Sequence, residues 1–291
     1  MKSYEQRLFP YLMLLPTILI FAVFLFYPAV KGFTISLTQW DGINPQKFIG
    51  LKNYVRLMAD HNFWDSFRST LLFTAITVPG ILVASLALAV LLTRQIKCSG
   101  FFRAAFYLPT MISSIVVGLS WRFLFGEDFG VINYLITAAG GTSVKWLTNP
   151  HCAMAVVIFV SIWSMAGYYM VMFIAGIKSI PETYYEAAQI DGATSWQQFS
   201  FITLPLLKPT TLLVLVLSTV TVIKTYPLVY ALTKGGPAGY TKFMVQLIQE
   251  TGFEKSKMGY ACAMTMVLFI LLAVITSFQF RLNRGGGQDE K

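Results

Sequence analysis

Six long runs of apolar residues constrain the fold of this chain more than any other feature. A helix needs about 20 apolar residues to cross the roughly 30 Å hydrocarbon core of a bilayer. The runs that meet or approach that length cover residues 10–30, 69–92, 104–121, 152–177, 209–232 and 258–280. In lipid each backbone hydrogen bond has to be made within the segment, and these runs do not alternate as barrel strands do. The sequence therefore predicts an all-α membrane bundle of six spans in a single transmembrane domain, residues 1–291.

Composition excludes several other classes of protein. Only 12% of the residues are charged and the mean hydropathy is +0.63, whereas soluble domains carry roughly 25% charged residues. The net charge is +9, but the basic residues lie between the apolar runs and form no patch that predicts nucleic-acid binding. The three cysteines are scattered and there are two histidines, so no disulfide framework or zinc site is indicated.

The first run and the prolines refine this prediction. Residues 10–30 exceed the 7–15 residues of a signal-peptide core, and no small-residue cleavage site follows them, so an uncleaved span is expected. Prolines inside the spans predict kinks where the ring removes a backbone donor. They are Pro16, Pro79, Pro109 and Pro227.

The Lys/Arg balance of the loops favours both termini in the cytoplasm. Basic residues concentrate on the cytoplasmic side of membrane proteins. The termini and the loops on their side hold 10 Lys/Arg in 62 positions, and the opposite loops hold 11 in 93. The first set is 1–9, 93–103, 178–208 and 281–291, and the second is 31–68, 122–151 and 233–257. The difference is small, so charge alone gives a weak orientation.

The loop at 178–208, between the fourth and fifth spans, carries clear signals for helix ends. Ser179 followed by Glu182 predicts a capping box, with Pro181 in the first turn. Gly192 is expected to end this first helix.

A second short helix is expected after that glycine. Thr194 and Gln197 predict its capping box, and it should end before Pro205. Two capped helices joined at a glycine form a compact knob, and Ala187 and Ala188 leave room for another surface to approach it closely.

The same loop carries the residues of a known family motif. Glu186-Ala187-Ala188, three residues, Gly192, nine residues and then Ile202-x-Leu204-Pro205 resemble the EAA loop in permease subunits of binding-protein-dependent ABC importers. Further stretches resemble the sugar-type branch, which includes MalF and UgpA. They are Trp40-Asp41-Gly42, Phe48 to Tyr54, Phe63-Trp64, Phe101-Phe102-Arg103 through Leu108-Pro109, and Leu232 to Pro237.

The resemblance implies a role for this loop and a set of partners. It implies a cytoplasmic coupling helix that docks on an ATPase subunit through Glu186, Ala187, Ala188, Asp191 and Gly192. It also implies a homologous second permease as heterodimer partner, two ABC ATPases and an extracellular solute-binding protein. No G-x-x-x-x-G-K-[ST] sequence occurs in the chain. This subunit is therefore expected to bind no cofactor and to be no enzyme, with ATP and Mg on the partner ATPase.

Candidate residues of the substrate pathway lie in the fourth and fifth spans. Lys224 is the only charged residue within the six windows, and an ionisable group inside a membrane suggests function. It could line the pathway or extend its amine to the interface. Trp163, Tyr168, Tyr169 and Tyr226 could stack on sugar rings, or pack between helices.

The expected function is transport of a carbohydrate, a di- or oligosaccharide, through the cell membrane of a bacterium or archaeon. Within the same architecture, the alternative is a permease for glycerol phosphate or another non-sugar solute. In a different class, a secondary transporter would show coupling-ion residues in its spans. The absence of carboxylates from the six windows disfavours that class.

Overall fold

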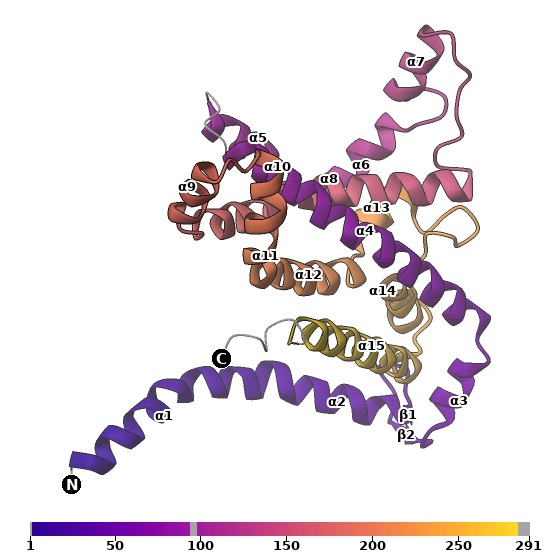
Figure 1. Cartoon of the computed structure of the whole chain (residues 1–291). Coiled ribbons are helices and arrows are strands. Elements are labelled where there is room, and N and C mark those ends of the chain that lie inside the picture. The colour runs from indigo at the N-terminus through magenta and orange to yellow at the C-terminus, as the bar shows by residue number, and fades with distance from the viewer. Residues whose placement is uncertain (1, 94–97, 285–291) are drawn as a thin grey trace. The chain divides into compact units, whose positions relative to one another are not determined.

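The computed structural model describes residues 2–93 and 98–284. The chain forms two compact units, Met1–His61 with Leu247–Ile270, and Asn62–Gln246 with Leu271–Lys291. Figure 1 shows that most of it is helical. Part of the loop 93–103, one of the segments counted for the orientation, lies outside the described residues, as does the tail beyond 284.

The first unit begins with a long apolar helix. It comprises α1 (Lys2–Phe21), a π-helical turn η1 (Ala22–Phe26) and α2 (Tyr27–Ser36). Residues Tyr11–Ser36 form a candidate membrane span, so the helix extends six residues beyond the predicted end at residue 30. Lys31 lies within this helix, and its Nζ lies 5.8 Å from the centroid of the Tyr27 ring.

A small hairpin follows this helix and is the part of the fold that an all-α prediction misses. Strands β1 (Thr38–Gln39) and β2 (Lys47–Phe48) pair antiparallel, with Thr38 opposite Phe48. The buried Asn53 side chain donates to the carbonyls of Ser36 (2.8 Å) and Thr38 (2.9 Å). It thereby fixes α3 (Lys52–Met58) against the start of the hairpin.

The unit is completed by η3 (Glu250–Glu254) and the first part of α15 (Met258–Arg284). The amide of Gly259 donates to the carbonyl of Trp40 at 3.1 Å. A Cβ at Gly259 would lie 2.0 Å from the carbonyl oxygen of Thr38, so this contact requires glycine.

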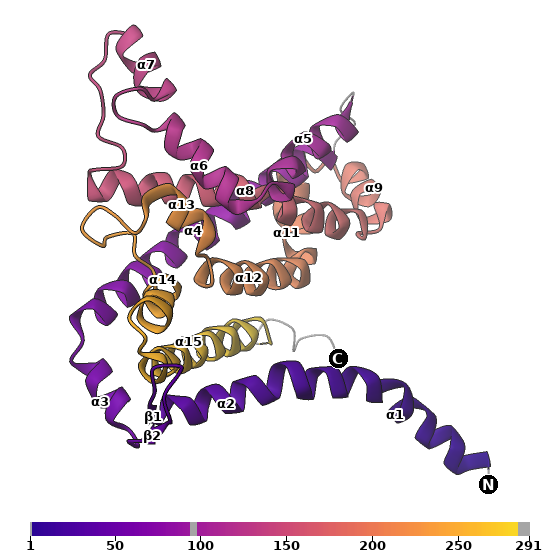
Figure 2. The same cartoon turned by 180° about the vertical axis from the view of Figure 1, so that it is seen from behind.

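The second unit is built on two long helices, α4 (His61–Thr93) and α8 (Pro150–Lys178). Against α8 pack α5 (Ser99–Met111) and α12 (Lys208–Ile223), while α6 (Ser114–Leu124) packs on α13 (Pro227–Thr233), as Figure 2 shows from behind. The core consists of buried apolar side chains from these helices, among them Phe73, Val157, Met170, Leu207 and Leu232. Two shorter helices, α7 (Val131–Ala138) and α14 (Met244–Gln249), lie in the connections.

Among the described residues, four helices are long and apolar enough to span a membrane without interruption: Tyr11–Ser36, His61–Thr93, Pro150–Lys178 and Met258–Arg281. Two bent helix pairs raise the possible number to six. One pair joins Ser99–Met111 to Ser114–Leu124 at 98°, and the other joins Ser195–Leu206 to Lys208–Ile223 at 65°. The helix continues through Pro16 and Pro79.

The third and fifth predicted windows, 104–121 and 209–232, are therefore not unbroken helices. In the third, Ile112 and Ser113 leave the helical region, with ψ of 141° and 130°. In the fifth, α12 ends at Ile223 and Tyr226 adopts φ −142°, just before Pro227. Pro227 has no N–H to donate to the carbonyl of Ile223, four residues earlier, and α12 ends at that residue.

Candidate functional site

The loop at 178–208 contains the first short helix predicted for it, with a different start. Helix α9 covers Glu182–Ile190, and its N-cap is Pro181 with no side-chain cap. The predicted capping box of Ser179 and Glu182 is wrong, because Ser179 is the C-cap of the preceding helix α8. Its hydroxyl donates to the carbonyl of Gly176 at 2.8 Å.

Gly192 ends α9 as predicted. It adopts φ +77°, a left-handed conformation that glycine takes without steric cost. The amide of Ala193 donates to the carbonyl of Ala188 at 2.8 Å, and the amide of Gly192 to that of Gln189 at 3.1 Å. These two bonds form a Schellman motif, which satisfies carbonyls that the helix end leaves open.

The second half of the loop starts as predicted and ends later. Thr194 and Gln197 form the capping box at the start of α10 (Ser195–Gln198). The helix continues through the π-helical turn η2 (Phe199–Thr203) into α11 (Leu204–Leu206), so the predicted end before Pro205 is wrong. The wider turn of η2 accommodates Pro205, so the helix does not end there. The hydroxyls of Tyr185 and Thr203 lie 2.9 Å apart and join the two halves.

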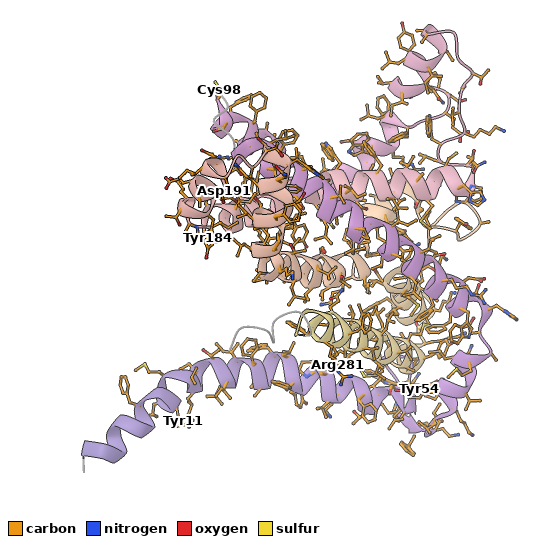
Figure 3. The ribbon with its side chains drawn as sticks, viewed as in Figure 1. Tyr11, Tyr54, Cys98, Tyr184, Asp191 and Arg281 are labelled. Atoms are coloured by element: carbon orange, nitrogen blue, oxygen red, sulfur yellow. The ribbon has the colours of Figure 1, made fainter. Side chains whose placement is uncertain are left out.

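The outer surface of this loop is exposed and partly apolar. Glu186, Ala187, Asp191 and Gly192 are exposed and Ala188 is half-buried. Figure 3 shows Tyr184 on α9 and Asp191 directly after its C-terminal end, at the outer edge of this unit. Three large apolar side chains nearby are also exposed: Ile190 by 86%, Trp196 by 72% and Phe201 by 77%. Exposed aromatic and aliphatic anchors of this kind are typical of a protein interface.

A second candidate site is a cavity of about 330 Å³ at the two helix breaks. Its walls come from the α5–α6 break, the middle of α8 and the α12–α13 break. The lining residues are Pro109, Thr110, Ile112, Ser114, Val117, Ser164, Met165, Tyr168, Tyr169, Thr221, Thr225 and Leu228. Tyr169 is buried and its hydroxyl donates to the hydroxyl of Thr221 at 3.4 Å. Hydroxyls and aromatic rings therefore dominate the polar and stacking groups of this cavity.

The structure brings only part of the predicted pathway together. Tyr168 and Tyr169 line the cavity, whereas Trp163, Lys224 and Tyr226 lie outside its lining. The Trp163 ring packs edge-on against Trp121, with 5.2 Å between centroids. Lys224 is exposed, and it is the C-cap of α12, whose last residue is Ile223.

Sequence reasoning missed the contribution of the α5–α6 break to this cavity. Pro109 and Thr110 on one side and Ser114 on the other line the wall. The available signal was a proline followed by polar residues, Thr110 and Ser113-Ser114, inside an otherwise apolar run. Broken helices that line a cavity are a recurring feature of membrane transport sites.

Comparison with known proteins identifies the family of this chain. Residues 54–285 match the model of the binding-protein-dependent transport system inner membrane component family. The probable starch degradation products transport system permease AmyD of Thermoanaerobacterium thermosulfurigenes is 35% identical, over 97% of this chain and 96% of that protein. The sn-glycerol-3-phosphate permease UgpA of Agrobacterium fabrum is 30% identical, over 96% of this chain and 95% of that protein.

A solved structure agrees with this assignment. A chain of a bacterial alginate ABC transporter, crystallised with a periplasmic protein bound to alginate pentasaccharide, superposes with a TM-score of 0.84. It is 26% identical, and the match covers 99% of this chain and 98% of that chain. The chain therefore belongs to the binding-protein-dependent transport system inner membrane component family, and is a multi-pass permease subunit of an ABC importer, not an enzyme.

Proposed function

We propose that this permease passes a neutral carbohydrate, a di- or oligosaccharide, from an external binding protein into the cytoplasm. The observation that carries the proposal is the chemistry of the cavity at the helix breaks. Tyr168 and Tyr169 offer ring faces for sugar rings, and Ser164, Thr221 and Thr225 offer hydroxyls for hydrogen bonds to sugar hydroxyls. A cavity lined by apolar and aromatic groups with a few placed polar atoms is typical of a small-molecule site.

The same cavity weighs against glycerol phosphate as the solute, although UgpA of Agrobacterium fabrum is a relative. Of the described residues that line it, none carries a charge. A phosphate ester removed from water is stabilised best by a Lys or Arg cation, because charge-assisted hydrogen bonds offset the loss of hydration better than neutral hydroxyls do. Lys224, the nearest candidate in the sequence, lies outside the lining.

In the same proposal, the loop at 178–208 docks on an ABC ATPase. The apolar anchors Ile190, Trp196 and Phe201 are exposed beside the carboxylates of Glu186 and Asp191. This combination gives an interface with an apolar centre and a charged rim. The chain would then have six spans, with both termini and this loop in the cytoplasm. The loop would face the two ATPases, which bind Mg-ATP. A second homologous permease would complete the pathway.

Uptake by reconstituted vesicles tests the transport proposal. The vesicles contain this chain, its second permease, the ATPases and the binding protein. Uptake of a maltodextrin should require ATP inside, and glycerol phosphate should not compete. Uptake driven by an ion gradient without ATP would instead indicate a secondary transporter.

The variant Ile190→Asp should stop uptake, whereas Phe129→Asp, at an 88% exposed position on another loop, should leave it unchanged.

Orientation has its own test. Cys98 is exposed at the start of α5 (Figure 3), in the loop 93–103 that we place in the cytoplasm. In right-side-out vesicles of a variant without the other two cysteines, a membrane-impermeant maleimide should label Cys98 only after the membrane is permeabilised. A cysteine introduced at Phe129 should be labelled without permeabilisation, and the reverse pattern would contradict the orientation.

A further inference from the structure

The first unit contains a polar cleft that has no part in the function proposed above. Its volume is about 600 Å³. The hairpin and its loop, α3 and the start of α15 form its walls. The lining residues are Gln39, Trp40, Asp41, Asn44, Pro45, Lys47, Ile49, Lys52, Asn53, Arg56, Ser256, Lys257 and Tyr260.

The cleft has a strong excess of positive charge. Four of its lining residues are basic, Lys47, Lys52, Arg56 and Lys257, and one is acidic, Asp41. All four basic side chains are exposed, so they remain accessible to a ligand.

Asp41 does not neutralise these cations through direct contact, because its own loop uses its carboxylate. One oxygen accepts from the amides of Ile43 (3.0 Å) and Asn44 (2.8 Å). These bonds lower the pKa of Asp41 to about 2. The Arg56 guanidinium lies 4.8 Å from the centroid of the Tyr260 ring, and the hydroxyl of Tyr260 donates to Asp60 at 2.7 Å.

The cleft lies where two candidate membrane spans end. The span Tyr11–Ser36 stops three residues before Gln39, and the span Met258–Arg281 starts directly after Lys257. A helix of 26 residues is about 39 Å long, which exceeds the roughly 30 Å hydrocarbon core. The ends of such helices reach the headgroup layer, where tryptophan and tyrosine side chains such as Trp40 and Tyr260 are enriched.

Helix α3 beside the cleft has the pattern of an interfacial helix. Its inner face buries Asn53 and Leu57, and Tyr54 (labelled in Figure 3) places its hydroxyl 2.7 Å from that of Ser36. An outer stripe remains exposed, consisting of Leu51 by 67%, Val55 by 70% and Met58 by 69%. Lys52 and Arg56 on the same helix line the cleft. A helix with one apolar face and basic side chains beside it is suited to lie in the plane of a membrane surface.

We propose that this cleft binds the phosphate headgroup of an anionic phospholipid, while the outer stripe of α3 lies among the acyl chains. The four basic side chains match the phosphate, and the adjoining stripe matches the lipid tail. An acidic protein surface would match the charges but would leave the stripe exposed to water. The proposal does not rest on the transported solute, and liposomes with anionic lipid in both leaflets make its test independent of the orientation of the chain.

Lipid retention by the purified full-length chain tests this proposal. The chain is extracted from liposomes of equal parts phosphatidylglycerol and phosphatidylcholine, and native mass spectrometry counts the lipids that stay bound. Three variants are compared. The test variant replaces Lys47, Lys52 and Lys257 by serine, and the conservative variant replaces the same three by arginine. The control variant replaces three exposed lysines outside the cleft, Lys145, Lys178 and Lys255, by serine.

Wild type, the arginine variant and the control variant should retain phosphatidylglycerol in preference to phosphatidylcholine. Each basic residue near an anionic surface contributes about fivefold in affinity, so the test variant should lose on the order of a hundredfold. An unchanged lipid preference in the test variant would overturn the proposal. If that variant kept its lipid and lost only the uptake that the binding protein stimulates, the cleft would belong to that partner instead. Displacement of the lipid by equimolar soluble glycerol phosphate would also overturn it, since the cleft would then bind free anions.

Discussion

Substitutions of Gly192 distinguish two reasons for a glycine in the 178–208 loop. One is its backbone conformation, and the other is the open space that it leaves for a partner. At φ +77° an alanine costs about 1–2 kcal/mol, because its Cβ crowds the following carbonyl oxygen. Nothing lies within 4 Å of a Cβ added there, so packing within the chain adds nothing to this cost. Asparagine tolerates the left-handed region far better than alanine. We expect Gly192→Ala to favour opening of the helix end by about 5–30-fold, and Gly192→Asn by threefold or less.

Hydrogen exchange at the end of α9 measures this effect. The Ala193 amide is protected by its 2.8 Å bond to the Ala188 carbonyl, so its protection factor should fall by those amounts in the purified protein. ATP-driven uptake should fall in the same order, more for alanine than for asparagine. Equal loss of protection in both variants would refute the conformational reasoning. Normal protection with equal loss of uptake would show that the ATPase needs the space above Gly192.

Three further predictions concern contacts in the two units. Gly259→Ala should destabilise the first unit by about 1–3 kcal/mol, seen as a lower melting temperature, because its Cβ would lie 2.0 Å from the Thr38 carbonyl oxygen. Tyr185→Phe removes the 2.9 Å contact with Thr203 and should cost about 1 kcal/mol, seen as faster hydrogen exchange in the loop, whereas unchanged exchange would mean that this contact does not stabilise it. The pKa of Asp41 falls from 3.8 to about 2, so its stabilising effect is full above pH 4 and disappears as the pH falls through 2. The fluorescence of the neighbouring tryptophan should change over that interval in wild type and not in Asp41→Asn.

Hydropathy predicted the uninterrupted helices because burial in lipid depends on local composition. The windows 69–92, 152–177 and 258–280 each lie inside a helix of the structure. The break at Ile112 and Ser113 could not be read in the same way, since neither residue is glycine or proline. Pro109 predicts a kink nearby, but whether the helix bends or stops depends on neighbouring helices that supply hydrogen bonds to the freed backbone groups.

The loop at 178–208 was largely predictable for a similar reason. Its caps are contacts between residues three to five apart, so Gly192 and the pair Thr194–Gln197 could be assigned from spacing. The capping box predicted for Ser179 was wrong because one residue can cap only one helix end, and Ser179 caps the end of α8.

The cavity needed the tertiary structure. Trp163 and Tyr168 are five residues apart on α8 and so point about 140° apart around the helix. The first side chain meets Trp121 while the second lines the cavity. Sequence placed these aromatic residues on the correct helix but could not choose between its faces.

The positions of the loop and the cavity suggest how one could act on the other. The loop joins the end of α8 to the start of α12, and both helices supply walls of the cavity, through Tyr169 and Thr221. Along the helix axes these residues lie about 14 Å and 20 Å from the loop, and the two helices are in contact. We infer that a displacement of the loop moves both helices as rigid bodies. Since α12 ends at Ile223 and α13 packs on α6, the movement would change the cavity at the break itself, where Thr225 lines its wall.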